Sequence, residues 1–202
     1  MGGFKMEKAD CLKHRKSSVV IAVQRPDGSP VSKREVEIRQ TGHSFLFGCG
    51  AFETLNITDS DSGPEKRAFY KERMEKWLKL FNYATLPFYW GQFEASEGNT
   101  NTKAVRRAAL WLKERGVILK GHPLCWHTQT APWLLELTNQ DILEKQLARI
   151  RREVTEFKGL IDMWDVINEV VIMPVFDKYD NGITRICKEL GRVQLVSEVF
   201  GE

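Results

Sequence analysis

A short apolar run at residues 164–169, WDVINE, ends on an amide and a carboxylate, Asn168 and Glu169. A carboxyl group in such a place can act as a general acid or base, and this kind of catalysis often uses a second carboxyl group beside it. A glutamate with apolar neighbours can stay protonated for that task. Taken alone, the pair has a plainer interpretation as a strand end that faces water, so the chemistry depends on what lies near it.

A second stretch, HPLCWHTQ at residues 122–129, places His122, Trp126 and His127 close together. A tryptophan offers a large apolar surface with one hydrogen-bond donor, which suits a flat, weakly charged ligand such as a sugar. In a strand, alternation puts His122 and Trp126 on one face and His127 on the other, unless the strand has already ended. Packing in the core remains the alternative role for each ring.

The composition excludes several classes of partner. The chain has 202 residues, a formal net charge of +3 and interspersed acids and bases, without a basic block typical of nucleic-acid binding. No apolar run approaches the ~20 residues of a membrane span. We therefore expect neither a nucleic-acid partner nor a membrane partner.

The cysteines stand apart from one another and show no zinc-like spacing, so we predict no metal site and no cofactor. Cys49 and Cys125 lie in apolar runs and are expected to be buried free thiols. Free thiols suit a reducing compartment, and no signal peptide is visible in the first 16 residues. We expect a cytoplasmic protein, with secretion as the alternative if the start of the sequence is incomplete.

Two regions are predicted along the chain. Residues 18–40 alternate apolar and polar side chains on both sides of an Asp-Gly turn, which indicates a β-hairpin appendage within residues 1–42. Residues 43–202 alternate apolar strands with amphipathic helices, which indicates a parallel sheet with helices outside it. The expected strands are 45–52, 83–90, 117–127 and 160–169, and the expected helices are 64–82, 102–115, 138–158 and 183–200, the last broken near Gly191.

Two α/β architectures fit this alternation, a doubly wound sheet and a (β/α)8 barrel. No phosphate-binding glycine loop is present, which disfavours the first. Polar and aromatic residues gather where successive strands end, as they do in barrel active sites. Such a barrel needs eight strands and ~250 residues, so the chain is predicted to form about the first four units. Its two outer strands would then be unpaired edges prone to self-association.

The segment GHPLCWHTQTAPW and the segment WDVINE, in this order, resemble glycoside hydrolase family 10, whose best-known members are retaining endo-β-1,4-xylanases. The resemblance extends from about residue 13 to the end of the chain. It implies that Glu169 is the general acid/base and that Asn168 binds the sugar 2-hydroxyl. It further implies that His122, Trp126 and Gln129 surround the sugar at the cleavage point. The substrate would be β-1,4-xylan or xylo-oligosaccharides.

The partner of Glu169 is not found in this chain. Asp165 shares its strand face, but four strand residues span ~13 Å, whereas a retaining pair of carboxyl groups lies ~5–5.5 Å apart. Asp165 is therefore expected to orient His122 instead. The family resemblance places the nucleophile on a later strand, beyond residue 202, so we expect this chain alone to be inactive.

The second strand departs from the family pattern. Its ATLPFYWGQFEASEG lacks the asparagine and lysine that bind sugar further from the cleavage point in family members. Tyr89 and Trp90 either replace them by stacking or pack in the core, and Trp133 is expected to pack. Two other functions remain open, a non-catalytic carbohydrate-binding fragment and a retaining β-glycosidase of another barrel family.

Overall fold

The computed structural model describes residues 16–42, 44–171 and 179–202. The chain divides into two compact units, Met1–His43 and Ser44–Glu202. Each unit is described by itself below.

The predicted hairpin of the first unit is present only at its turn. Gln24 and Pro30 form an isolated antiparallel bridge, and the Asp27 carboxylate accepts hydrogen bonds from the backbone and the hydroxyl of Ser29. Among residues 16–42 no longer ladder forms, and the flanking apolar side chains are exposed, Val20 by 96%. The prediction of two full strands was wrong because a two-stranded ribbon with no packed face gains little stability.

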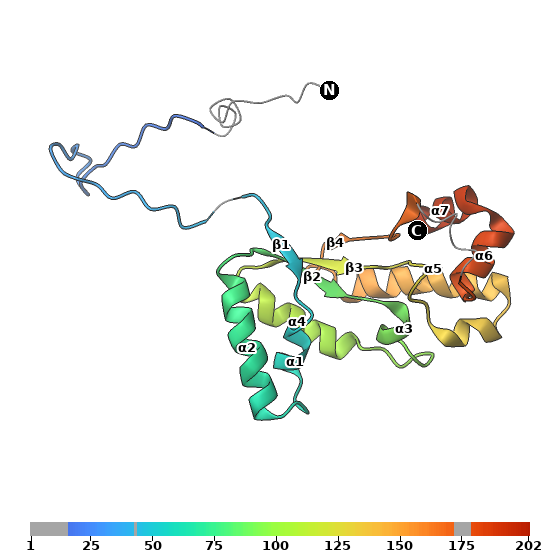
Figure 1. Cartoon of the computed structure of the whole chain (residues 1–202). Helices are drawn as coiled ribbons and strands as arrows, with labels where there is room; N and C mark the ends of the chain where they lie inside the picture. The colour runs from blue at the N-terminus through green and yellow to red at the C-terminus, as the bar shows by residue number, and fades with distance from the viewer. Residues whose placement is uncertain (1–15, 43, 172–178) are drawn as a thin grey trace, which may run out of the picture. The chain divides into compact units, whose positions relative to one another are not determined.

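The second unit alternates strands and helices (Figure 1). Its strands are β1 (Gly48–Gly50), β2 (Tyr83–Pro87), β3 (Ile118–His122) and β4 (Met163–Trp164). Its helices are α1 (Thr54–Thr58), α2 (Pro64–Leu78), α3 (Trp90–Phe93), α4 (Thr102–Lys113), η2 (Pro132–Glu136), α5 (Asn139–Glu156), α6 (Gly182–Leu190) and α7 (Arg192–Gly201). The short helices α1, α3 and η2 were not predicted, since they carry too few turns to show a period.

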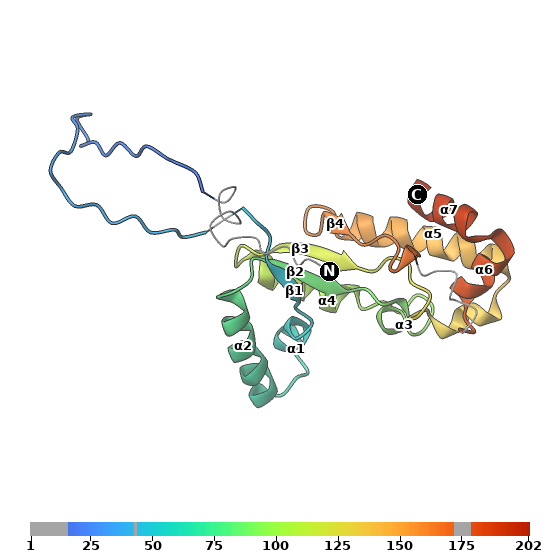
Figure 2. The same cartoon turned by 45° about the horizontal axis from the view of Figure 1, so that its top comes forward.

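The four strands form one parallel sheet in the order β1-β2-β3-β4. Figures 1 and 2 both show α1, α2 and α4 on the same side of this sheet. Ala84, Leu86 and Leu119 point to the helical side and are buried, while alternate residues such as Lys120 and His122 lie on the other face. This arrangement is that of successive units of a barrel wall, with helices outside and polar side chains inside.

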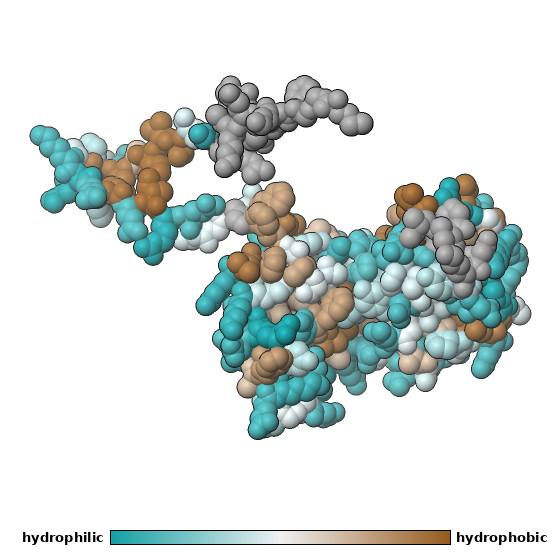
Figure 3. Space-filling model, in the orientation of Figure 1, coloured by the Kyte–Doolittle hydropathy of each residue, from teal (hydrophilic) through white to brown (hydrophobic). Residues whose placement is uncertain are grey.

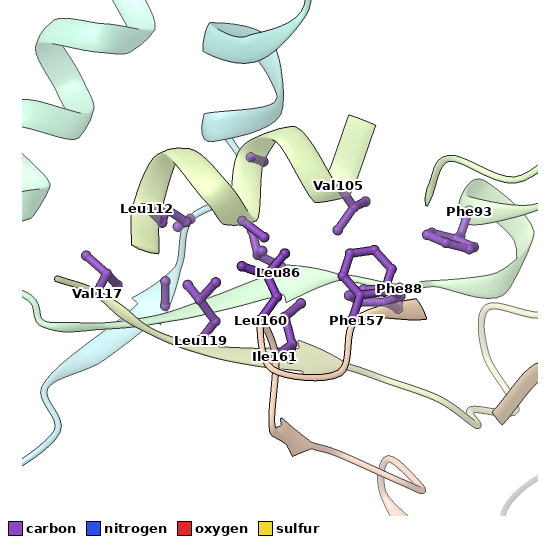
Figure 4. Close-up of a cluster of buried hydrophobic side chains, with 14 of the residues drawn as sticks. Leu86, Phe88, Phe93, Val105, Leu112, Val117, Leu119, Phe157, Leu160 and Ile161 are labelled. Atoms are coloured by element: carbon purple, nitrogen blue, oxygen red, sulfur yellow. The ribbon is translucent and has the colours of Figure 1, made fainter. Parts of the chain in front are cut away.

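The core beneath the sheet is aromatic at one end. Phe88 packs against Phe157 and Trp164, with ring centroids 5.1 Å and 4.8 Å away. Figure 4 shows Phe88, just past β2, beside Phe157, which follows α5. A second buried cluster, which includes Leu124 and Ile142, lies between η2, α5, α6 and α7.

All four expected strands are longer than the observed ones: β2 ends at Pro87 and β3 at His122, short of the expected ends at residues 90 and 127. The expected buried strand 45–52 contains only β1, whose three residues are exposed, because β1 is an edge strand and two of them are glycines. Cys49 is therefore exposed, contrary to expectation, while Cys125 is buried. The expected strand 160–169 contains only β4, because beyond Trp164 the pairing continues only as an isolated parallel bridge between Cys125 and Ile167. The predicted break at Gly191 is confirmed, with φ at 80° between α6 and α7.

No helix in the described ranges is both long enough and apolar enough to cross a membrane. The surface view in Figure 3 shows mixed polar and apolar side chains, with apolar ones near the start of β1. Phe45 and Phe47, which precede β1, are 67% and 49% exposed.

Candidate functional site

The candidate site is built where β2, β3 and β4 end. Parallel strands bring their carboxyl ends to one edge, so the residues that follow them meet there. Backbone hydrogen bonds continue the contact past the strands: Leu124 N donates to Asp165 O at 2.9 Å, and Asn168 N donates to Cys125 O at 2.9 Å. The two motifs, about 40 residues apart in sequence, are thereby held side by side.

A charged cluster lies on the polar face of the sheet. The Asp165 carboxylate is 2.6 Å from His122 Nδ1 and 2.7 Å from Lys120 Nζ. Partial burial opposes ionisation, but the hydrogen bonds from Lys120 and His122 hold the pKa of Asp165 below its usual value. The contact expected between Asp165 and His122 is present, and it fixes the orientation of the imidazole ring.

Glu169 is held by the indole of Trp126. Trp126 Nε1 donates to Glu169 Oε2 at 2.8 Å, and His127 Nε2 lies 3.9 Å from the same oxygen. The Glu169 side chain is 39% exposed, so a ligand can reach its carboxylate. Its backbone is left-handed, with φ at 57°, a conformation that non-glycine residues adopt mainly where the surroundings impose it.

His127 is buried beside this pair. Burial lowers its pKa to about 4, although the charge of Glu169 acts in the opposite direction. The ring is thus neutral near neutral pH. β3 ends at His122, so strand alternation does not reach His127, and its ring comes to the same side as Trp126.

Three rings line the surface next to Glu169. The centroid of Tyr89 is 5.5 Å from that of His122 and 5.7 Å from that of Trp126. Tyr89 and Trp126 are each half-buried, so part of each ring remains open to solvent. Tyr89 therefore belongs with the candidate site, whereas its neighbour Trp90 is buried in the core.

Asn168 and Gln129 are the two amides expected at the site. Asn168 directly precedes Glu169 in the turn after β4 and is half-buried. Gln129 lies in the loop after β3 and is also half-buried. Their expected contacts with a sugar remain predictions.

Glu94 and Glu97, which follow β2, lie away from this cluster. Glu94 is buried, and its carboxylate pairs with Arg152 at 2.6 Å and accepts from Trp90 Nε1 at 3.0 Å. Glu97 pairs with Lys145 at 2.6 Å. A hollow of about 200 Å³ lies between these groups and Trp133, whose ring packs edge-on against that of Trp90. These residues tie α3 to α5.

Three residues of the site were missed or ranked low from sequence. Lys120 directly precedes the quoted motif, and its alternation with His122 would have placed it on the same strand face. Tyr89 was left between stacking and packing, and His127 was expected on the opposite face. Within the described ranges, no three or more histidine, cysteine or carboxylate side chains are grouped so as to hold a metal ion.

The cluster thus contains the exposed carboxylate of Glu169, held by the Trp126 indole, and an imidazole, His122, oriented by Asp165. The rings of Tyr89 and Trp126 lie beside them. Residues 71–185, more than half of the chain, match the family described as glycosyl hydrolase family 10. The chain belongs to this family. The resemblance predicted from the two motifs is thereby confirmed.

The relatives in family 10 are longer proteins. Endo-1,4-beta-xylanase 5 of Arabidopsis thaliana is 27% identical over 169 residues, which are 82% of this chain and 28% of the relative. The endo-1,4-beta-xylanase/feruloyl esterase of Xylanibacter ruminicola is 31% identical over 129 residues, which are 60% of this chain and 16% of the relative. The chain thus spans less than a third of the length of either relative.

Solved structures of family 10 share the fold. An endoxylanase retrieved from a sugarcane soil metagenome has a TM-score of 0.58 at 20% identity, over 78% of this chain and 45% of that one. The family 10 structure from Paenibacillus barcinonensis has a TM-score of 0.50 at 23% identity, over 63% and 36%. The predicted fold class, part of a (β/α)8 barrel, is confirmed.

Proposed function

We propose that this protein acts as a glycoside hydrolase of the endo-β-1,4-xylanase type, on β-1,4-xylan or xylo-oligosaccharides. Membership of family 10 supports the reaction class, and the two named relatives are xylanases. The observation that carries the proposal is the hydrogen bond from Trp126 Nε1 to the exposed carboxylate of Glu169. This hydrogen bond holds a carboxyl group next to the partly exposed rings of Tyr89 and Trp126.

Glu169 is proposed to act as general acid/base. Its carboxyl group delivers a proton to the leaving oxygen as positive charge develops on the sugar ring. The neutral ring of His127, 3.9 Å away, places no positive charge beside it near neutral pH. Asn168 is proposed to bind the sugar 2-hydroxyl, a bond that strengthens in the transition state.

The sugar is proposed to lie against Tyr89 and Trp126. A pyranose presents flat apolar faces that pack on aromatic rings. His122, oriented by Asp165, is proposed to hydrogen-bond a sugar hydroxyl, and Gln129 to contact the same sugar. Tyr89 then adds a stacking contact to the sugar at the cleavage point, on a strand that lacks the asparagine and lysine of other members.

A retaining reaction needs a second carboxylate ~5–5.5 Å from Glu169. Asp165 is committed to Lys120 and His122. We propose that the nucleophile is outside these 202 residues, in the part of the family fold that this chain does not span. The 202-residue chain by itself is then expected not to hydrolyse xylan.

The proposal is tested by expressing the 202 residues alone and with any following coding sequence, and assaying both on xylan, xylo-oligosaccharides and cellulose. The longer protein should hydrolyse xylan, and Glu169→Gln should lower its kcat by roughly 10²–10⁴-fold. Hydrolysis by the 202-residue chain that is lost on Glu169→Gln would contradict the missing nucleophile. Sugar binding without hydrolysis by every form would favour a carbohydrate-binding role instead.

A further inference from the structure

The β2–β3 ladder ends just before the candidate site. Pro87 and His122 are the last paired residues, and Phe88 N donates to His122 O at 2.7 Å. Beyond this pair, the segment after β2 continues to Tyr89 and the segment after β3 continues to Trp126. The carbonyls of Phe88 and Leu124 lie past the ladder in buried residues, and buried carbonyls need a donor from elsewhere.

Arg149, from the middle of α5, supplies that donor. Its side chain is fully buried, and its guanidinium donates to the carbonyls of both Phe88 and Leu124. It also lies 3.5 Å from Pro123 O, and Gln146 Nε2 donates to Leu124 O at 3.0 Å. One side chain therefore links the segments that follow β2 and β3.

The buried cation is part of an ion network. Burial lowers the pKa of Arg149 to about 10, while the charge of Glu153 one turn later raises it, so the group stays protonated at neutral pH. Glu153 pairs with Arg152 at 2.8 Å, and Arg152 pairs with Glu94 at 2.6 Å. The guanidinium also lies 4.9 Å above the ring of Trp90, which restricts its movement further.

We propose that Arg149 is a positioning residue for the candidate site: by tying Phe88 to Leu124, it sets the distance between the rings of Tyr89 and Trp126 and places the Trp126 indole against Glu169. The inference rests on the proposed function only in that this site is the proposed glycosidase site. The positioning itself concerns the hydrogen bond from Trp126 to Glu169, which is present without any bound sugar.

An arginine suits this position for a geometric reason. Its planar guanidinium carries five donors in a fixed fork, which can reach carbonyls of two separate segments at once. A lysine keeps the charge but has a single nitrogen on a flexible stem, so it can hold one segment well and the other poorly. Arg149→Lys therefore keeps the positive charge of Arg149 but loses its ability to bond both segments at once.

The test follows the indole N–H signal of Trp126 by NMR in the 202-residue chain, with the signal assigned by Trp126→Phe. Glu169→Gln replaces the carboxyl acceptor by an amide and should shift this signal in the wild-type background. The same substitution is then made in Arg149→Met, in Arg149→Lys and in the control Arg185→Met. Arg185 is a matched control because it donates to Leu135 O and Leu137 O, away from the ends of β2 and β3.

If Arg149 positions Trp126, the shift caused by Glu169→Gln should be lost in Arg149→Met and reduced by more than half in Arg149→Lys. It should stay full in Arg185→Met. The indole signals of Trp77 on α2 and Trp111 on α4 report that each variant is folded. If Arg149→Met does not fold, Arg149→Lys decides the question. A full shift in a folded Arg149 variant would overturn the proposal, and because no hydrolysis is measured, this result leaves the proposed function standing.

Discussion

Glu169 has an exposed carboxylate, which accepts a hydrogen bond from the Trp126 indole, and a left-handed backbone. Such a backbone costs of order 1–3 kcal/mol in a non-glycine residue and persists only where neighbouring contacts hold it. The contacts here are the Trp126 indole and the backbone bond from Asn168 to Cys125. At the scale of the residue, strain and a fixed donor coincide on the carboxylate expected to do the chemistry.

His127 should remain neutral in conditions where an ordinary histidine is charged. Its pKa is lowered to about 4 in the folded chain, against about 6.5 when unfolded. Only the unfolded state then binds the proton between these values, so stability falls as pH falls from 6.5 to 4, by up to ~1.4 kcal/mol per pH unit. NMR titration of the ring and urea unfolding of wild type and His127→Asn check this. A ring that titrates near 6.5 would contradict it.

Asp165→Asn should destabilise the chain by about 1.5–3 kcal/mol at neutral pH, because Lys120 and His122 lose a charged acceptor. The folded-state pKa of Asp165 is lowered, so its contribution is present above the unfolded value of about 3.9 and declines as pH falls below it. Urea unfolding of both proteins at neutral and acidic pH measures the difference. An equal difference at every pH would show that the carboxylate charge is not responsible.

Among the helices, α5 places Arg149 at the ends of β2 and β3. Its first turn is capped by Thr138, whose hydroxyl accepts from Asp141 N at 3.2 Å. Thr138→Ala should lower the free energy of unfolding by about 1 kcal/mol, and Thr138→Ser, which keeps the hydroxyl, should lose less. Thermal and urea unfolding give both values. Equal losses in the two variants would exclude a capping effect.

Strand β3 has a glycine where no side chain fits. A Cβ on Gly121 would lie 2.2 Å from the Trp164 ring, which packs on Phe88. Gly121→Ala should therefore destabilise the chain by about 1–3 kcal/mol through overpacking. Gly63→Ala is the control, since a Cβ there meets nothing within 4 Å. Similar unfolding midpoints for the two variants would contradict the packing argument.

At the scale of the whole molecule, the sheet of the described residues has β1 and β4 as its outer strands. Unpaired strand edges favour association, and exposed Phe45 and Phe47 precede β1. We expect the 202-residue chain to self-associate at high concentration and Phe47→Lys to reduce this, since a charge at an edge opposes pairing. Sedimentation velocity under reducing conditions measures it, with Phe200→Lys on α7 as the control. A monomer at all concentrations would contradict the expectation.

The sequence predicted the longer elements well and the short ones poorly. Helices α2, α4 and α5 have enough turns to show their period, and the break at Gly191 carried its own signal. β1 and β4 are shorter than the apolar runs that contain them, because a run of apolar residues does not reveal where sheet pairing stops. The wrong expectation that Cys49 is buried came from the same error, since burial depends on what lies across the sheet.

The sequence by itself determined the order of strands and helices, the two motifs and the family, because these depend on local periodicity and residue type. Only the tertiary structure decided which side chains meet. Lys120 and His122 reach Asp165, Trp126 reaches Glu169, and Arg149 links the ends of β2 and β3. These contacts join residues about 25 to 60 positions apart, and they exist because parallel pairing brings separate strand ends to one edge of the sheet.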